Sequence, residues 1–257
     1  MRDDHCFVVL AYGDSPFLDG CLGGLKAQTI RTRLVVATST PSPFISDAAT
    51  RHGVALIVNP RREGIGSDWN FGLTLSDTRY VTLAHQDDLY DPRFAETTLR
   101  LFDNRPDAAL CFTGYREVDD HGHEKTFKIS RVKHLLEAAI VGRRERVGGE
   151  RLMAFLAFGN PLPCSSVTFN RARLPDFRFS LEYSSNLDWD AWVKLQQQGE
   201  TFLHAAERLI GRRHNSLTET ARLISSGLRQ KEDLMMFRRI WPAPLSDAIA
   251  YLYRASY

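Results

Sequence analysis

Short apolar runs alternate with longer segments of helical spacing along the first half of the chain. The apolar runs have the length of buried strands and lie at residues 7–11, 34–37, 54–58, 80–84 and 108–112. The helical segments lie at residues 16–28, 43–52, 67–76 and 92–104, and three of them begin at a proline, which a first helical turn tolerates. This alternation predicts an α/β fold of the Rossmann-like type, a mostly parallel sheet with helices on both faces.

The rhythm of strands and helices changes after residue 112. Residues 114–119 and 124–129 have the pattern of a hairpin with a turn at Asp120-His121-Gly122. Further elements are expected as a helix at 150–158, a strand at 165–169 and a helix at 188–198. We therefore predict a domain over residues 1–218, with halves at 1–112 and 113–218, followed by a C-terminal helical segment over residues 219–257.

The composition is typical of a folded intracellular protein. Of its 257 residues, 43% are hydrophobic and 25% are charged, so the chain is long enough to bury a sizeable core. A formal charge of +2 is too balanced to indicate a nucleic-acid partner, and four cysteines without paired spacing favour a reducing compartment. We expect a cytoplasmic protein, because the chain shows neither the apolar stretch of a signal peptide nor the roughly 18 apolar residues of a membrane span.

Two adjacent carboxylates, Asp87 and Asp88, follow the apolar run that ends at residue 84. An α/β sheet forms its ligand crevice at the strand ends, so we expect these carboxylates to lie there. Neighbouring carboxylates repel each other unless a divalent cation binds them, a proton is shared between them, or water surrounds them. We favour the cation, and the alternative is a solvated helix start before Pro92.

Five motifs follow one another between about residues 7 and 218. They are Val8-Val9-Leu10-Ala11-Tyr12 with Gln28-Thr29, Asn59 with Gly64-Ile65-Gly66 and residues 68–73, Gln86-Asp87-Asp88 with Pro92, Asp188-Trp189-Asp190, and Arg212-Arg213-His214 with Ser216. In this order they resemble the motifs of the inverting family 2 glycosyltransferases, which share the GT-A fold. The resemblance implies transfer of a sugar from a nucleotide-sugar donor to a hydroxyl of a glycan or lipid-linked acceptor, in bacterial surface polysaccharide biosynthesis.

The resemblance also assigns residues to the donor and to a metal. It implies a nucleotide-sugar-binding half over residues 1–112 and an acceptor half over residues 113–218. The donor contacts that it implies are Ala11, Tyr12, Thr40, Asn70, His85, Gln86, Asp87 and Arg213. Cleavage of the bond between sugar and phosphate leaves negative charge on the diphosphate, which a divalent cation offsets. The resemblance implies Mn²⁺ or Mg²⁺ held by Asp87, Asp88 and His214.

A carboxylate near the start of the helix at 188–198 is the candidate base. The acceptor hydroxyl must lose its proton as it attacks the anomeric carbon, and one carboxylate within hydrogen-bond reach suffices. The resemblance assigns this role to Asp188, with Asp190 as the fallback, and the rings of Trp189 and Trp192 are expected to border the acceptor sugar. From the residues alone, Asp188 also fits a helix cap and the tryptophans also fit a core.

The chain departs from the family pattern at three places. The second strand ends in Thr38-Ser39-Thr40, where the family usually has an Asp-rich end that reaches the nucleobase. His85 replaces the usual first Asp of the metal motif, and Leu187 replaces the usual Glu before the base. These departures keep open a second interpretation, a non-catalytic nucleotide- or glycan-binding module. Nucleotidyl transfer is disfavoured, because the loop at residues 12–16 lacks the Gly-rich, Lys- or Arg-bearing form that such enzymes use.

The C-terminal segment at 219–257 is basic and aromatic. Arg238-Arg239-Ile240-Trp241 and the aromatic end at 251–257 have the composition of a segment that rests on an anionic membrane. Docking on the domain and dimer formation are the alternatives. Peripheral contact with the inner face of the membrane is thus one of three predictions for this segment.

Overall fold

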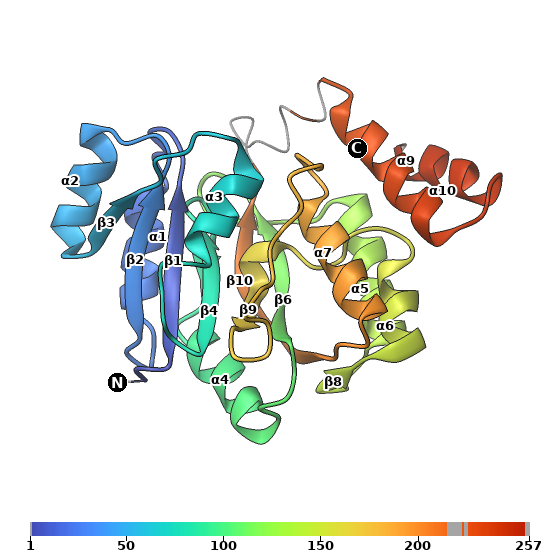
Figure 1. The fold of residues 1–257 in the computed structure, drawn as a ribbon, viewed down its shortest axis with the longest axis horizontal. Coiled ribbons are helices and arrows are strands. Elements are labelled where there is room, and N and C mark those ends of the chain that lie inside the picture. Colours follow the sequence, from blue (N-terminus) through green and yellow to red (C-terminus); the bar gives the residue numbers. More distant parts are fainter. Residues whose placement is uncertain (1, 215–222, 224–225, 255–257) are drawn as a thin grey trace.

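The computed structural model describes residues 2–214, 223 and 226–254, and ten of its strands form one mixed sheet (Figure 1). The strands are β1 (His5–Ala11), β2 (Arg33–Thr38), β3 (Ala55–Val58), β4 (Tyr80–His85), β5 (Leu89–Tyr90), β6 (Leu110–Val118), β7 (Glu124–Lys125), β8 (Arg146–Val147), β9 (Val167–Asn170) and β10 (Phe202–Arg213). The helices are α1 (Leu18–Lys26), α2 (Pro43–His52), α3 (Ile65–Gly72), α4 (Phe94–Asn104), α5 (Lys128–Ile140), α6 (Gly149–Leu156), α7 (Leu187–Gln197), α9 (Leu228–Ile240) and α10 (Leu245–Arg254).

The sheet has the order β3-β2-β1-β4-β9-β6-β10-β5. Strands β3, β2, β1 and β4 are parallel to one another. Strand β9 runs antiparallel between β4 and β6, whereas β10 is parallel to β6. The parallel first half and the change of pattern after residue 112 are therefore as the sequence predicts.

Helices cover both faces of β1, which explains its uninterrupted apolar sequence. Phe7 and Val9 lie in one buried core together with Leu18 of α1. Val8 lies in a second core together with Trp69 of α3, because successive strand residues point to opposite faces. A strand buried on both faces is typical of a parallel sheet between two helical layers.

Most predicted elements of the first half are confirmed, and α2 has the predicted bounds. Helix α3, predicted over 67–76, begins at Ile65 and ends earlier, at Gly72. Beyond its end, Thr74 Oγ1 donates to Phe71 O (2.7 Å), and Ser76 Oγ accepts from the N–H of Thr78 (3.3 Å). These hydroxyl groups offer the backbone local hydrogen bonds that compete with the helix.

The second half differs from the prediction at several elements, among them β9, which begins at Val167 rather than at residue 165, and α5, which was not predicted. The hairpin of β6 and β7 is confirmed, but β7 is only two residues long because α5 begins at Lys128, so the predicted strand at 124–129 is wrong beyond Lys125. Strand β10 has twelve residues and was not predicted. Its apolar pattern is interrupted at the exposed residues 206–208, where its register against β6 shifts.

Helices α9 and α10 dock on the domain. Met236, Phe237 and Tyr253 belong to the same buried core as Trp189 of α7. Trp241 donates its indole N–H to a backbone carbonyl of the domain (2.8 Å). Docking, one of the three predictions for the C-terminal segment, is thus observed, whereas its predicted boundary at 218/219 and Ser216 lie outside the described residues.

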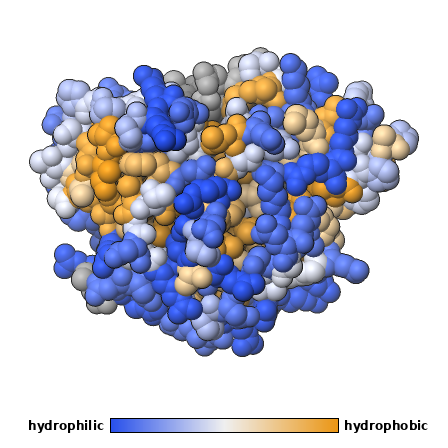
Figure 2. Space-filling model, viewed as in Figure 1, coloured by the Kyte–Doolittle hydropathy of each residue, from blue (hydrophilic) through white to orange (hydrophobic). Residues whose placement is uncertain are grey.

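The described residues include no helix that is both long and apolar enough to cross a membrane. On the face of the molecule that Figure 2 shows, hydrophilic side chains separate the apolar residues into several patches. This face therefore presents no continuous apolar band.

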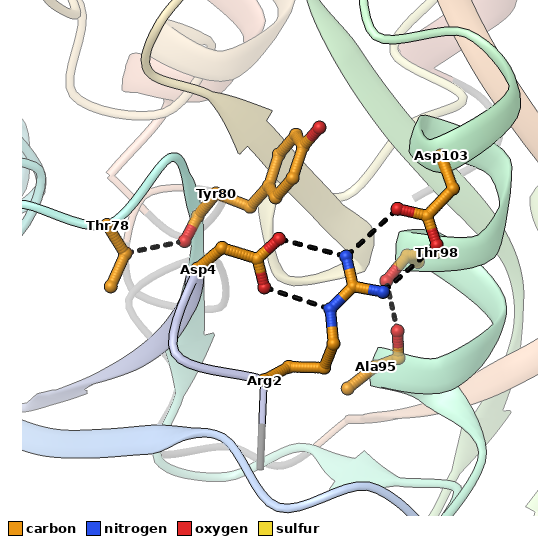
Figure 3. Close-up of polar contacts among 7 residues, drawn as sticks. All are labelled: Arg2, Asp4, Thr78, Tyr80, Ala95, Thr98 and Asp103. Atoms are coloured by element: carbon orange, nitrogen blue, oxygen red, sulfur yellow. Dashed lines mark hydrogen bonds and ion pairs between the residues drawn. The ribbon is translucent and has the colours of Figure 1, made fainter.

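An arginine ties the amino-terminal end of β1 to α4. The Arg2 guanidinium donates four hydrogen bonds of 2.9 to 3.0 Å to Asp4 and Asp103 (Figure 3). Nearby, the Tyr80 ring stacks on Phe102 of α4, with 4.4 Å between the ring centroids. Because β1 and β4 are parallel, these contacts stabilise the amino-terminal ends of both strands.

Candidate active site

A cavity of about 560 Å³ opens at the carboxyl ends of β1, β4 and β10. In an open α/β sheet this edge is the usual place for a ligand. The residues predicted for the site that line the cavity are Ala11, Tyr12, His85, Gln86, Asp87, Asp88, Asp188, Arg213 and His214. The structure thus brings most of the residues predicted for the site together at one cavity.

His85, Asp87 and Asp88 form the candidate metal centre at the end of β4. One potential ligand atom of each lies within 4.8 Å of the other two. Asp88 is 3% exposed, and its Oδ1 accepts a hydrogen bond from the N–H of Arg213 (3.0 Å). Asp88 Oδ2 and His85 Nε2 are buried without a hydrogen-bond partner in the described part of the chain. Such atoms need a partner, and a divalent cation fits two carboxylates and an imidazole.

Burial shifts the pKa values in this cluster. It raises the pKa of Asp88 to about 7, and the negative charge of Asp87 adds to the increase. Burial also lowers the pKa of His85, which keeps the imidazole neutral at pH 7, the form that binds metals. Binding of a cation at this cluster would therefore release a proton from Asp88.

Gln86 joins the ends of β1 and β4. Its Nε2 donates to Tyr12 O (2.7 Å), and its Oε1 accepts from the N–H of Tyr12 (3.2 Å). The side-chain amide of Gln86 is thus engaged by the backbone. Ala11 is buried beside it, whereas Tyr12 is 54% exposed and offers a ring on which a planar ligand group can stack.

Helix α3 supplies a carboxylate to the end of β2, where the sequence lacks one. Asp68 Oδ2 accepts from Ser39 Oγ (2.8 Å), and Asp68 Oδ1 accepts from Asn59 Nδ2 (2.9 Å). Asp68 lines the cavity together with Thr38. Each carboxylate oxygen retains a second lone pair, so Asp68 can accept a further N–H. Asp68 lies within a recognised motif, but only the packing of α3 brings it to the end of β2.

Two predicted donor contacts, Thr40 and Asn70, hold loops and are not among the residues that line the cavity. Thr40 Oγ1 accepts from the N–H of Gly13 (2.8 Å), which joins the loops after β2 and β1. Asn70 Nδ2 donates to Phe179 O (2.9 Å), and Asn70 Oδ1 accepts from the N–H of Phe179 (2.7 Å). Both residues thus contact the backbone, and their contacts to the donor stay predictions.

Arg213 braces the loop that carries Asp87. Its Nε donates to Asp87 O (2.9 Å), and its Nη1 donates to Asp119 O (2.5 Å). Its guanidinium lies over the ring of Phe17, 4.1 Å from the ring centroid. Two of the five N–H groups of the Arg213 guanidinium are therefore directed to the backbone.

Arg212 and His214 share a buried carboxylate. His214 Nε2 lies 2.7 Å from Glu117 Oε2, and Arg212 Nη1 lies 3.5 Å from Glu117 Oε1. Burial alone would raise the pKa of Glu117, but Arg212 and His214 lower it to about 2. His214 lines the cavity without joining the cluster at β4, so its role as a metal ligand stays a prediction.

Asp188 lies in the first turn of α7, lines the cavity and is 9% exposed. Its Oδ1 accepts from the N–H of Trp189 (2.8 Å). Burial raises the pKa of Asp188, because the charged form loses its hydration. The carboxylate predicted as the base therefore lies on the same cavity as the metal cluster.

The other acidic and aromatic residues at the start of α7 serve the core. Asp190 is 1% exposed, forms ion pairs with Lys194 (2.8 Å) and Arg239, and is not among the cavity residues. Trp189 and Trp192 are fully buried and donate their indole N–H groups to backbone carbonyls at 2.9 and 3.0 Å. The prediction that their rings border the acceptor is wrong, because burial and these hydrogen bonds hold them in the core.

Two cations that the sequence analysis missed also line the cavity. They are Lys133 of α5 and Arg229 of α9. No motif marks them, because only the docking of these two helices brings them to the site. The positive charge of Arg229 acts on Asp188 and opposes the effect of burial on its pKa.

The fold and the site thus define an α/β protein with a cavity at the carboxyl edge of its sheet, lined by an acidic cluster and a separate buried carboxylate. The chain matches the family model "Glycosyl transferase family 2" over residues 6–173, more than half of its length, and it belongs to that family. No curated protein sequence matches the chain.

Solved glycosyltransferase structures have a similar fold. TarS 1–349 of S. aureus in complex with UDP-GlcNAc has a TM-score of 0.67 at 13% identity, with 97% of this chain and 72% of that chain covered. The mannosyltransferase PcManGT of Pyrobaculum calidifontis in complex with GDP-Man and Mn²⁺ has a TM-score of 0.67 at 14% identity, with 99% and 70% covered. The glucosyl-3-phosphoglycerate synthase of Mycobacterium tuberculosis in complex with Mn²⁺ and UDP-Glc has a TM-score of 0.59 at 14% identity, with 95% and 81% covered.

These comparisons confirm the predicted GT-A fold. The present chain spans 43% of the longer TarS chain, again at 13% identity and with a TM-score of 0.63. At such low identity the likeness to the solved structures shows the fold alone.

Proposed function

We propose that this protein is an inverting glycosyltransferase that moves a sugar from a nucleotide-sugar donor to a hydroxyl of a glycan or lipid-linked acceptor. The observation that carries the proposal is one cavity that holds both the cluster of His85, Asp87 and Asp88 and the separate buried carboxylate of Asp188. Membership of family 2 supports it, as do the UDP-GlcNAc, GDP-Man and UDP-Glc bound by the similar structures. Bacterial surface polysaccharide biosynthesis in the cytoplasm is the setting that we propose.

In this mechanism Asp188 is the base. Its carboxylate takes the proton of the acceptor hydroxyl while the oxygen attacks the anomeric carbon opposite the departing diphosphate, so a single displacement inverts the centre. Burial raises the pKa of Asp188, which strengthens it as a base. Arg212, at the end of β10, contributes positive charge beside the leaving group.

The acidic cluster fits a metal in the donor half. His85, Asp87 and Asp88 would hold Mn²⁺ or Mg²⁺, which when bound stabilises the charge that forms on the diphosphate. Arg213 and Gln86 keep the cluster in place through their hydrogen bonds to the backbone. Asp68, at the end of β2, is then the group that faces the nucleobase.

A panel of nucleotides tests the donor site. UDP, dTDP, GDP and CMP, and their sugars, are added with and without Mn²⁺ while thermal unfolding is followed. A ligand at about 100 times its Kd stabilises the folded protein by roughly 2.7 kcal/mol. We expect a shift for one base that needs Mn²⁺ and is lost in Asp87→Asn. The control Asp77→Asn, at a side chain that is 87% exposed, should keep the shift, and a panel without any shift would contradict the proposal.

The alternative, a non-catalytic binding module, is separated from the enzyme by turnover. Once the panel has identified the donor base, hydrolysis of the matching sugar nucleotide is followed over hours. The transferase should release nucleoside diphosphate slowly, and Asp87→Asn should stop the release. Binding without any release, with or without candidate acceptors, would favour the module.

Peripheral membrane contact through the C-terminal segment remains our proposal for α10 alone. Tyr251 and Leu252 are 75% and 70% exposed and are the side chains that would make the contact. Flotation with vesicles that contain anionic lipid, comparing the parent protein with the Tyr251→Ser/Leu252→Ser variant, tests it. Equal recovery of both proteins with the vesicles would contradict a role for these two residues.

A further inference from the structure

Helix α9 presents a buried carboxylate to the turn that precedes α7. Glu232 is 4% exposed. Its Oε1 accepts from the N–H of Ser184 (2.8 Å), and its Oε2 accepts from the N–H groups of Ser185 and Asn186 (2.8 and 2.9 Å). One side chain of the C-terminal segment thus binds three consecutive backbone N–H groups, 46 to 48 residues away in the sequence.

Further contacts join the same two elements. Asp233 Oδ1 accepts from Asn186 Nδ2 (2.8 Å), and Arg229 Nη1 donates to Ser185 Oγ (2.8 Å). Arg239, farther along α9, pairs with Asp190 of α7. Residues from both ends of α9 therefore contact the turn at residues 184–186 or the first turn of α7.

The charge of Glu232 suits its place. The N–H groups that lead into a helix lack partners within the helix, and its amino-terminal end carries partial positive charge. Each of the three hydrogen bonds that this carboxylate accepts is therefore charge-assisted. Replacing Glu232 by a neutral side chain weakens all three contacts, and an amide also turns an NH₂ group toward at least one N–H.

This turn is part of the cavity wall. Ser184, Ser185 and Asp188 line the cavity together with Arg229 of α9. Asn186 is the residue before α7, and Asp188 lies in the first turn that it starts. A displacement of the turn would therefore displace the Asp188 carboxylate relative to the rest of the cavity.

We propose that Glu232 is a positioning residue for Asp188: it fixes the turn at residues 184–186 and thereby sets where the base stands in the cavity. The proposal rests on the role of Asp188 in the proposed function. Glu232 does not touch the reacting atoms and acts only through this turn. Displacement of a reacting group by about 1 Å costs on the order of 100-fold in rate, so loss of the anchor should reduce kcat strongly.

The test replaces Glu232 by Gln and measures transfer, donor binding and the pH profile of kcat. We expect kcat to fall by about 10- to 100-fold, while the Kd for the donor changes by less than about twofold. The acid limb of the pH profile should move to lower pH, because a loosened turn hydrates Asp188 and reverses the effect of burial on its pKa. Loss of stability alone would not move this limb when kcat is measured well below the unfolding temperature.

Two further variants complete the design. Asp247→Asn, which removes an exposed ion pair between α9 and α10 (Arg238 to Asp247, 3.0 Å), is the matched control and should leave kcat unchanged. Glu232→Asp keeps the charge but withdraws it by about one bond length, roughly 1.5 Å. It should lower kcat by a smaller factor and move the acid limb of the pH profile in the same direction. It replaces Glu232→Gln as the test if that variant does not fold.

The outcomes separate this proposal from the proposed function. Full transfer activity in Asp188→Asn would overturn the role of the base and the positioning role with it. If Asp188→Asn abolishes transfer but Glu232→Gln and Glu232→Asp keep the parent kcat and pH profile, only the positioning role is overturned. A loss of donor binding equal to the loss of kcat in the Glu232 variants would also overturn it, because the effect would then extend to the whole cavity.

Discussion

Replacing Asp188 by Asn removes a negative charge from the cavity and leaves the shape of the side chain intact. Asp188 Oδ1 accepts from the N–H of Trp189 (2.8 Å), and the amide oxygen of Asn can accept the same hydrogen bond. We therefore expect α7 to keep its first turn. A positioned general base contributes about 100- to 10,000-fold to a rate, so kcat for transfer should fall by that factor. This corresponds to roughly 3 to 5 kcal/mol of transition-state stabilisation.

Although its activity should fall, the stability of Asp188→Asn should stay the same or rise. Burial raises the pKa of Asp188, so the charged carboxylate lowers the stability of the folded protein at neutral pH, whereas the neutral amide does not carry this cost. Asp188→Asn should therefore unfold at the same temperature as the parent or at a higher one. An inactive but equally stable protein distinguishes loss of the base from loss of the fold.

The assay is single-turnover transfer with the donor that the nucleotide panel identifies, at several pH values. In the parent, the single-turnover rate constant should decline as the pH falls through the pKa of Asp188, which burial raises above the usual value of 3.8 for Asp. The residual activity of Asp188→Asn should lack this decline, and donor affinity should be kept. Transfer within about twofold of the parent in the folded variant would refute the reasoning. Asp190→Asn is the control: it weakens the ion pairs of a buried carboxylate outside the cavity, so it should lower the stability and leave kcat nearly unchanged.

Three further predictions concern the cavity and the sheet. In Asp68→Asn, the affinity for UDP or GDP should fall by about tenfold relative to CDP in competition binding, because the amide NH₂ opposes the ring N–H of uracil or guanine, whereas the unprotonated N3 of cytosine can accept from it; an unchanged ratio would contradict the role of Asp68. In Asn70→Ala, the unfolding free energy should fall by about 1 to 3 kcal/mol with little change in nucleotide Kd, since the backbone of Phe179 loses both hydrogen bonds. Burial lowers the pKa of His5 to about 3, so the unfolded chain binds more protons between pH 6.5 and 3 and stability falls as the pH drops through that window. Between pH 8 and pH 5 His5 should contribute a loss of about 2 kcal/mol, measured in denaturant titrations as the amount by which the parent loses more stability than His5→Leu, in which Thr82 keeps Thr168 as its partner (2.8 Å).

The first half of the fold is predictable because most residues of its central strands β1 and β4 are buried. Such strands form continuous apolar runs, and the prolines at the helix starts mark where each run ends. The second half is less predictable for a physical reason. Strand β10 carries exposed residues at 206–208 and a register shift, so neither alternation nor a continuous apolar run marks it.

Motif positions locate the cavity but do not assign the task of each residue. Gln86, Arg213 and Asn70 all occupy positions of recognised motifs, yet their polar groups bind the backbone. Such contacts depend on which loops meet in space. Asp87 and Asp188 both line the cavity, because Asp87 lies just beyond the end of β4 and Asp188 lies at the start of α7, whereas their roles as metal ligand and base stay predictions.

The contribution of the C-terminal segment could not be deduced from the sequence, because its charges have two possible uses. Along the chain, the basic and aromatic residues after 218 favour a membrane surface as much as an intramolecular contact. In the structure the acidic residues of α9 favour the intramolecular contact, because Glu232 and Asp233 are buried against the turn before α7. A helix bound to a membrane would instead leave its carboxylates in water. A buried carboxylate is stable only with good partners, and the three N–H groups at residues 184–186 are those partners. The helix that composition alone would assign to the membrane is therefore bound to the element that carries the proposed base.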